Sequence, residues 1–178
     1  MKGVPVGVAL IMLVAACGDD GASSSSPTDE GFFFPVNASF DGFRSWEAFH
    51  LTEGVPGGDV HLAGPRTEYL NKRPPKGSKE FPVGTVIVKE LEVGANDTRK
   101  VFAMAKRGGT YNSSGARGWE WFELENNADG SLKRILWRGL GPPKGEQYGG
   151  DPNGCGGCHA AHQANDYVSS AVLDLSKL

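Results

Sequence analysis

The sequence predicts a mainly β (α+β) domain, built on an antiparallel β-sheet with a few short helices. Two observations carry this prediction. Five segments have strand character, and short stretches of turn-forming residues join most of them, which is typical of antiparallel sheets. The 178-residue chain also contains 26 glycines and 11 prolines, which indicates many turns and disfavours a helix bundle. The length suggests one domain of ordinary size.

The first 16 residues predict a secretion signal. Lys2 supplies a positive charge, and Val4–Ala16 is an apolar run that is too short to span a bilayer but typical of a signal peptide. The run ends in Val-Ala-Ala before Cys17, which resembles the bacterial lipobox. That resemblance implies cleavage before Cys17 and lipidation of this cysteine, and an ordinary signal peptide with an incidental cysteine is the alternative.

Residues 17–31 follow as the lipidated cysteine and a polar, Ser-rich segment without an apolar face. This composition predicts a flexible tether between a membrane and a domain over residues 32–178. Aspartate does not directly follow Cys17, so the inner-membrane retention signal is not cleanly present. We therefore expect the domain to face the periplasm from the outer membrane.

The first elements of the domain are a helix and a short strand. Asp41 precedes Phe43, Trp46 and Phe49, whose spacing predicts a short amphipathic core helix with Asp41 as its N-cap. The strands are predicted at Arg66–Leu70, Thr85–Val93, Val101–Arg107, Trp119–Glu125 and Leu132–Trp137.

Lys89 has an unusual position in the strand Thr85–Val93. Because side chains alternate along a strand, Lys89 falls in the middle of its more apolar face, with Ile87 and Leu91 on either side. A lysine in such a place usually extends its stem along the apolar surface to reach water. The alternative is an amine that points to a cofactor in the core.

Cys155, Cys158 and His159 form a Cys-x-x-Cys-His motif, which is the attachment signature of a c-type haem. Two thiols at this spacing can add to the two vinyl groups of one porphyrin, and the adjoining histidine is then directed to the iron. A helix of about two turns is predicted to begin in the motif and to run to Asn165. This makes it the haem-attachment helix of the predicted fold.

Two other interpretations of the motif are a redox dithiol and a zinc site that includes His162. A thioredoxin-like dithiol should follow a strand early in a βαβ unit, and this motif lies near the C-terminus. Four zinc ligands within residues 155–162 would lack the usual long gap between ligand pairs. We therefore expect one covalent haem c.

The residue at the sixth iron position decides between functions. Electron-transfer cytochromes usually place Met or a second His there. Met104 lies in an apolar predicted strand, where core packing is the favoured role, and His50 and His61 flank a turn-rich segment typical of a surface. His162 is too close to His159 to reach the opposite face of the same ring. The sequence thus favours an open sixth site over an electron-transfer cytochrome.

Several blocks of the sequence together resemble a known family. These blocks are GTVIVKEL at 84–91, the strand around Trp119, the late CGGCH motif, Asp166–Val168 and Arg66–Tyr69. The combination resembles the cytochrome P-460 family and its cytochrome c′-beta relatives, from Phe32 to about Ser170. Many cytochromes share CxxCH, and the GTVxVKEL block is much more specific.

The resemblance implies a mostly antiparallel β fold, usually dimeric, with a five-coordinate haem c. Cytochrome P-460 members oxidise hydroxylamine to nitrous oxide or nitric oxide, and a lysine bonds to a meso carbon of their porphyrin. The matching lysine here is Lys89. The c′-beta members bind gaseous ligands such as nitric oxide in apolar pockets capped by phenylalanine, a role in which we would place Phe81.

Two functions therefore stay open, a hydroxylamine-oxidising enzyme and a nitric-oxide-binding cytochrome without catalysis. Oxidation would need a distal carboxylate as base, for which Glu146 and Asp151 in the loop before CGGCH are the candidates. It would also need a redox partner that accepts electrons. The net charge of −3 gives no basic excess, so nucleic acid is excluded as a partner.

Overall fold

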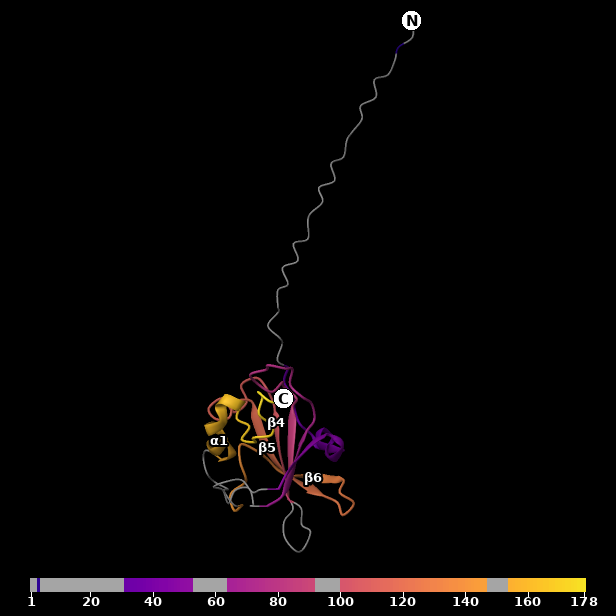
Figure 1. Cartoon of the computed structure of the whole chain (residues 1–178), viewed down its shortest axis with the longest axis vertical. Helices are drawn as coiled ribbons and strands as arrows, with labels where there is room; N and C mark the ends of the chain where they lie inside the picture. The colour runs from indigo at the N-terminus through magenta and orange to yellow at the C-terminus, as the bar shows by residue number, and fades with distance from the viewer. Residues whose placement is uncertain (1–2, 4–30, 53–63, 92–99, 147–153) are drawn as a thin grey trace.

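The computed structural model describes residues 3, 31–52, 64–91, 100–146 and 154–178. Within these residues, six strands form one antiparallel sheet in which each strand pairs with the next along the chain (Figure 1). They are β1 (Glu47–Leu51), β2 (Arg66–Leu70), β3 (Val86–Leu91), β4 (Lys100–Lys106), β5 (Trp119–Asn126) and β6 (Leu132–Gly139). The predicted mainly β fold with an antiparallel sheet is thereby confirmed.

The helices of the described chain are short. They are η1 (Asn37–Phe40), η2 (Phe43–Ser45), α1 (Gly154–His159) and η3 (Ala160–Asn165), of which only α1 is α-helical and the others are 3-10 helices. The helix predicted from the CGGCH motif to Asn165 is confirmed as α1 followed by η3. None of the helices in the described ranges is long and apolar enough to cross a membrane.

The prediction of an amphipathic helix after Asp41 is wrong. Phe43–Ser45 forms a single 3-10 turn, and the chain then enters strand β1, which contains Phe49. A spacing of three residues fits a 3-10 turn as well as an α-helix. The turn begins after Gly42, whose φ of 66° lies in the left-handed region, and the pairing of β1 with β2 holds the following residues extended.

Each face of the sheet buries its own apolar cluster. Phe40 and Phe43 of η1 and η2 cover one face, where Phe40 packs 5.0 Å from the ring of Phe122. Helix α1 and the C-terminal segment lie on the opposite face, shown in yellow in Figure 1. Side chains on a strand point alternately to the two faces, so Ile87 and Lys89 belong to the face that α1 covers.

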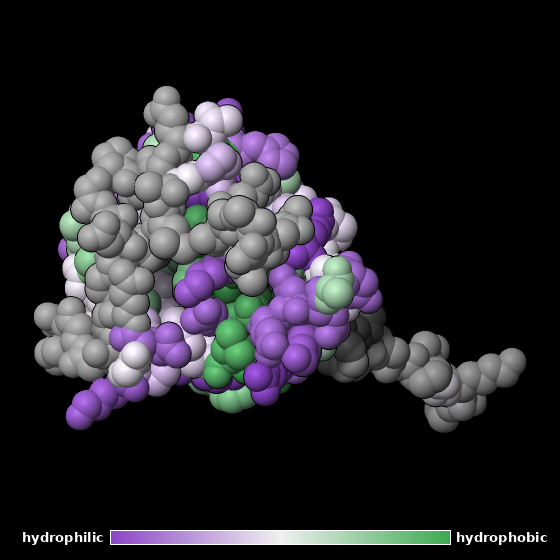
Figure 2. Space-filling view, turned by 90° about the horizontal axis from the view of Figure 1, so that it is seen from below, coloured by the Kyte–Doolittle hydropathy of each residue, from purple (hydrophilic) through white to green (hydrophobic). Residues whose placement is uncertain are grey.

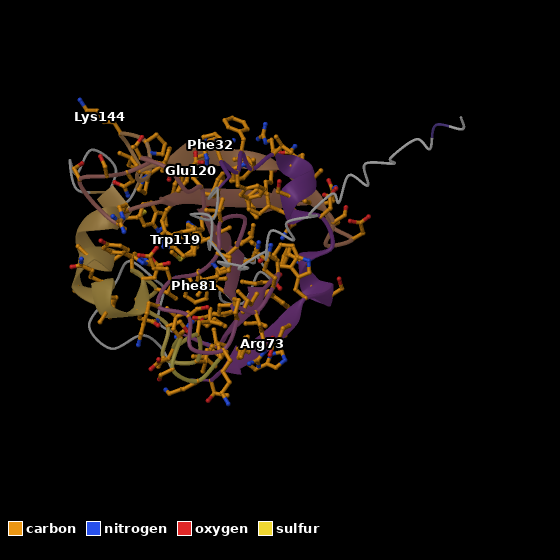
Figure 3. The ribbon with its side chains drawn as sticks, turned by 90° about the horizontal axis from the view of Figure 1, so that it is seen from above. Phe32, Arg73, Phe81, Trp119, Glu120 and Lys144 are labelled. Carbon is orange, nitrogen blue, oxygen red and sulfur yellow. The ribbon has the colours of Figure 1, made fainter. Side chains whose placement is uncertain are left out.

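One buried carboxylate, that of Glu120, ties the strands to the N-terminal segment of the domain. Glu120 accepts hydrogen bonds from Arg107 and Arg138, and these two arginines also donate to the carbonyl oxygens of Phe33 and Pro35. Figure 3 shows Glu120 and Phe32 in the same region of the molecule. Because a buried carboxylate is stable only with such partners, this network fixes residues 31–36 against the sheet.

Candidate cofactor site

A cavity of about 180 Å³ lies between the sheet and the C-terminal segment, on the face that α1 covers. Its wall contains both Lys89 and His159, the two residues whose place in the sequence predicts contact with a cofactor. The complete wall consists of Arg66, Glu68, Ile87, Lys89, Phe102, Ala103, Met104, Trp121, His159, Val168, Ser169, Ser170, Ala171 and Leu173. Figure 2 shows one face of the molecule on which apolar residues lie recessed between polar ones.

The sheet contributes two rows of side chains to this wall. Paired residues of neighbouring antiparallel strands point to the same face, so the strand register determines the rows. The apolar row consists of Ile87, Met104 and Trp121, and the mixed row consists of Glu68, Lys89 and Phe102. A flat apolar group can therefore pack against the first row while Lys89 reaches it from the second.

His159 is oriented by a backbone carbonyl. Its Nδ1 lies 2.6 Å from the carbonyl oxygen of Tyr167, and because a carbonyl only accepts, Nδ1 carries the proton. Burial lowers the pKa of His159 to about 4, so the ring is neutral at neutral pH. Nε2 is then the basic nitrogen, and a histidine held in this way is typical of metal ligands. The ring of Trp121 packs edge-on at 5.4 Å.

A left-handed bend places that carbonyl. Asp166 and Tyr167 have φ values of 48° and 66°, which are uncommon for residues other than glycine. The Asp166 carboxylate accepts hydrogen bonds from Lys106 Nζ at 2.6 Å and from the backbone N–H of Phe81 at 2.9 Å, and its carbonyl accepts one from Trp119. These contacts anchor the bend to the sheet, and so the position of the Tyr167 carbonyl is fixed.

The two cysteines of the motif differ in exposure. Cys155 is partly buried and Cys158 is exposed, and no disulfide joins them. Burial raises the pKa of the Cys155 thiol to about 11, so it is uncharged at neutral pH. Helix α1 starts against the end of β6, where a side chain on Gly141 would meet the Cα of Gly154 at 2.8 Å. The glycines therefore allow the close approach that sets the motif beside the cavity.

Lys89 is an amine with an unusual acidity. Burial lowers its pKa from 10.5 to about 7, opposed by the nearby Glu68 carboxylate and assisted by Arg66. Its Nζ lies 5.8 Å from the centre of the Phe102 ring. About half of such amines are neutral at pH 7, and a neutral amine is a nucleophile where an ammonium is not.

Three buried polar atoms in residues of the cavity wall have no hydrogen-bond partner within the described chain. They are Glu68 Oε2, Trp121 Nε1 and Ser170 Oγ. Buried polar groups are nearly always paired, so unpaired ones around one cavity point to a missing ligand. The indole N–H only donates and the hydroxyl can donate, and these two suit the carboxylates of a porphyrin.

The other residues proposed from the sequence lie away from the cavity wall or outside the description. Phe81 is buried against Trp119, with ring centres 5.9 Å apart, and is not among the wall residues (Figure 3). Glu146 is exposed in the loop after β6, near Lys144, which points outward. Asp151 and Cys17 lie outside the described residues. The roles proposed for these four residues stay predictions.

Of the alternative iron ligands, one lies in the same cavity wall as His159 and the other described ones do not. Met104 lies in the cavity wall, whereas His50 is exposed on β1 and contacts Thr67 at 3.0 Å. His61 lies outside the described residues, and His162 is exposed in η3. The described residues hold no group of three or more His, Cys, Asp or Glu side chains that could bind a metal ion.

Sequence reasoning gave no role in the site to the charged and aromatic wall residues Arg66, Glu68, Phe102 and Trp121. Glu68 and Arg66 carried a signal, since the predicted strand Arg66–Leu70 places both charges on one face. Which face of the sheet this was depended on the pairing of β2 with β3, which sets Glu68 opposite Lys89.

Comparison of the chain with protein-family models, with curated proteins and with solved structures found no match.

Proposed function

We propose that this chain is a mono-haem c-type cytochrome with an open sixth iron site that oxidises hydroxylamine. The observation that carries the proposal is that Lys89 and His159 lie in the wall of one largely apolar cavity, and that His159 ends the short helix that carries the two cysteines of a haem-attachment motif. A haem in this cavity would supply an iron able to accept electrons from a small nitrogen compound.

The residues of the site suit such a group. Cys155 and Cys158 would form thioether bonds, and His159 would ligate the iron through Nε2, because Tyr167 holds the proton on Nδ1. Trp121 Nε1 would donate a hydrogen bond to a haem carboxylate. The apolar row of the sheet would exclude water from the porphyrin, which strengthens every polar contact made inside the cavity.

Lys89 would form a third covalent bond to the porphyrin, after the two thioethers, as the resemblance to cytochrome P-460 implies. This bond would replace one N–H of the amine and the meso C–H of the ring, so its formation would be a two-electron oxidation that requires an oxidant such as a peroxide. The lowered pKa of Lys89 supports this role, because the bond requires a neutral amine. Its place beside Phe102 and opposite Glu68 sets the amine on the cavity side of the sheet.

A nitric-oxide-binding cytochrome without the lysine bond is the second candidate. The observation that favours it is the aromatic and aliphatic character of the wall, in which Phe102 and Ile87 flank the amine. An electron-transfer cytochrome with Met104 as sixth ligand is a third and weaker candidate. Met104 lies between Ile87 and Trp121 in the apolar row of the sheet, which favours a packing role for its side chain.

The setting of the site is part of the proposal. Lipidation of Cys17 and the tether up to residue 31 would hold the domain at the outer membrane, facing the periplasm. The exposed Cys158 would mark the edge of the haem through which electrons leave to a redox partner. A homodimer, as in the family that the chain resembles, belongs to the same proposal.

The test is to express the chain with a bacterial haem c maturation system, and to record the reduced optical spectrum and the intact mass. We expect one haem per chain and a strongly red-shifted Soret band. In Lys89→Ala this shift should disappear and hydroxylamine oxidation should fall, while an exposed control, Lys133→Ala, should behave as wild type. The mass change expected for the bond between Lys89 and the porphyrin should be present in the wild type and in Lys133→Ala, and absent in Lys89→Ala.

Different results lead to different conclusions. An ordinary haem c spectrum that is unchanged in Lys89→Ala, with nitric oxide binding intact, would favour the second candidate. A low-spin spectrum without nitric oxide binding would contradict both leading candidates. Failure to attach haem under conditions that mature a control cytochrome would refute the proposal as a whole.

A further inference from the structure

Glu68 presents an unsatisfied acceptor in the cavity wall. The residue is 5% exposed, and its Oε1 accepts a hydrogen bond from Arg66 Nε at 3.0 Å. Its Oε2 is buried and has no hydrogen-bond partner in the described part of the chain. A buried carboxylate oxygen without a donor is strongly unfavourable, so the cavity is built for an occupant that brings one.

A haem alone does not supply this donor. The ion pair with Arg66 identifies Glu68 as a carboxylate, which can only accept hydrogen bonds. The polar groups of a haem are themselves carboxylates, and they suit the donors Trp121 Nε1 and Ser170 Oγ on the same wall. Glu68 Oε2 can therefore accept a hydrogen bond from an N–H or O–H group of a further molecule in the cavity.

We propose that Glu68 is the hydrogen-bond acceptor that makes the cavity select a small ligand carrying N–H or O–H groups. This inference rests on the proposed function and deepens it, because hydroxylamine carries three such protons and nitric oxide carries none. In the mixed row Glu68 lies directly opposite Lys89, and Phe102 lies on the other side of Lys89, so the acceptor faces the same space as the amine.

The test compares two ligands on the ferric holoprotein by optical titration. In Glu68→Gln the affinity for hydroxylamine should fall about tenfold or more, which is the loss expected for a hydrogen bond to a charged acceptor. The affinity for nitric oxide should stay within about threefold of wild type, because no proton is shared with that ligand.

A second variant covers the case in which Glu68→Gln fails to fold because Arg66 loses its partner. Glu68→Asp keeps the charge and withdraws the oxygen by one methylene, and it should show the same selective loss of hydroxylamine affinity. The matched control is Glu123→Gln. Glu123 is the partner of Phe102 on the next strand, but its carboxylate accepts a hydrogen bond from Trp137, and Glu123 is not part of the cavity wall. Intact mass of each variant shows whether the bond to Lys89 has changed.

The outcomes separate this inference from the proposed function. A wild-type protein that binds and oxidises hydroxylamine, with affinities unchanged in both Glu68 variants, overturns the role of Glu68 and leaves the function standing. Equal losses for hydroxylamine and nitric oxide also overturn it, because they indicate a structural effect. A wild type that does not bind hydroxylamine overturns both.

Discussion

The buried ion pair between Asp166 and Lys106 offers a sharp test of how His159, the proposed iron ligand, is held in place. Asp166 is 3% exposed and Lys106 is 5% exposed. Replacement of Asp166 by Asn keeps the shape and retains an acceptor for the Phe81 N–H, but it removes the charge that faces the Lys106 ammonium. The change therefore isolates the ion pair from the rest of the bend.

The loss of stability expected in Asp166→Asn follows from the burial of both Asp166 and Lys106. Removing one partner of a buried ion pair leaves an uncompensated charge and costs about 3–5 kcal/mol. Domains of this kind are stabilised by only about 5–15 kcal/mol, so we expect a lowering of the unfolding midpoint on the order of 10 °C. The bend at Asp166 and Tyr167 should also loosen, because its strained φ values depend on these contacts.

Chemical denaturation gives the free energy of unfolding, and the optical spectrum of the protein with the proposed haem reports on its iron ligand. The control is Glu80→Gln, which breaks the exposed pair with Arg117 and should cost less than about 1 kcal/mol. A double variant, Asp166→Asn with Lys106→Met, should recover much of the loss because it removes the stranded charge. A loss in Asp166→Asn no larger than in Glu80→Gln would refute the reasoning.

Two further predictions concern Lys89 and the start of α1. For the chain without haem, Lys89→Met should raise the free energy of unfolding by a few kcal/mol below pH 7. The pKa of Lys89 is about 7 in the folded chain and has its ordinary value of 10.5 in the unfolded chain. The gain in stability should therefore shrink as the pH rises from 7 to 10.5, and it should vanish at higher pH. A gain that is constant from about pH 6 to about pH 10 would contradict this prediction. Gly154→Ala should lower the thermal midpoint and the yield of attached haem, because Gly154 has a φ of 48° and a Cβ there would collide with Leu140. Gly156→Ala in the same helix, with its nearest contact at 3.6 Å, should stay close to wild type, and equal effects of the two changes would disprove the steric argument.

The sheet could be predicted from sequence because its strands carry strong local patterns. Thr85–Val93 and Trp119–Glu125 are rich in β-branched and aromatic residues, and the structure places β3 and β5 within one or two residues of those bounds, as far as it describes them. The helix predicted over Phe43, Trp46 and Phe49 was wrong because a three-residue spacing does not distinguish an α-helix from a 3-10 turn followed by a strand. Tertiary pairing with β2 decided that segment.

The candidate site could be predicted only where one residue type carried the chemistry. The motif at residues 155–159 names a cofactor, and Lys89 stood out as a charge on an apolar strand face. Glu68 did not stand out, because its significance depends on the register that sets it opposite Lys89 and on the C-terminal segment that closes the cavity. Such long-range relations have no counterpart in the local pattern of residues 66–70.

The burial of Lys89 is the feature that most needs a function to explain it. An amine held in an apolar wall with a pKa of about 7 destabilises the fold by a few kcal/mol at neutral pH, and an aliphatic residue at the same place would not. A second cost lies beside it, in the carboxylate oxygen of Glu68 that lacks a donor. Groups that destabilise the chain alone but gain partners when a cavity is filled are typical of binding sites. A porphyrin bonded to Lys89 would remove the first cost, and a protic ligand hydrogen-bonded to Glu68 would remove the second.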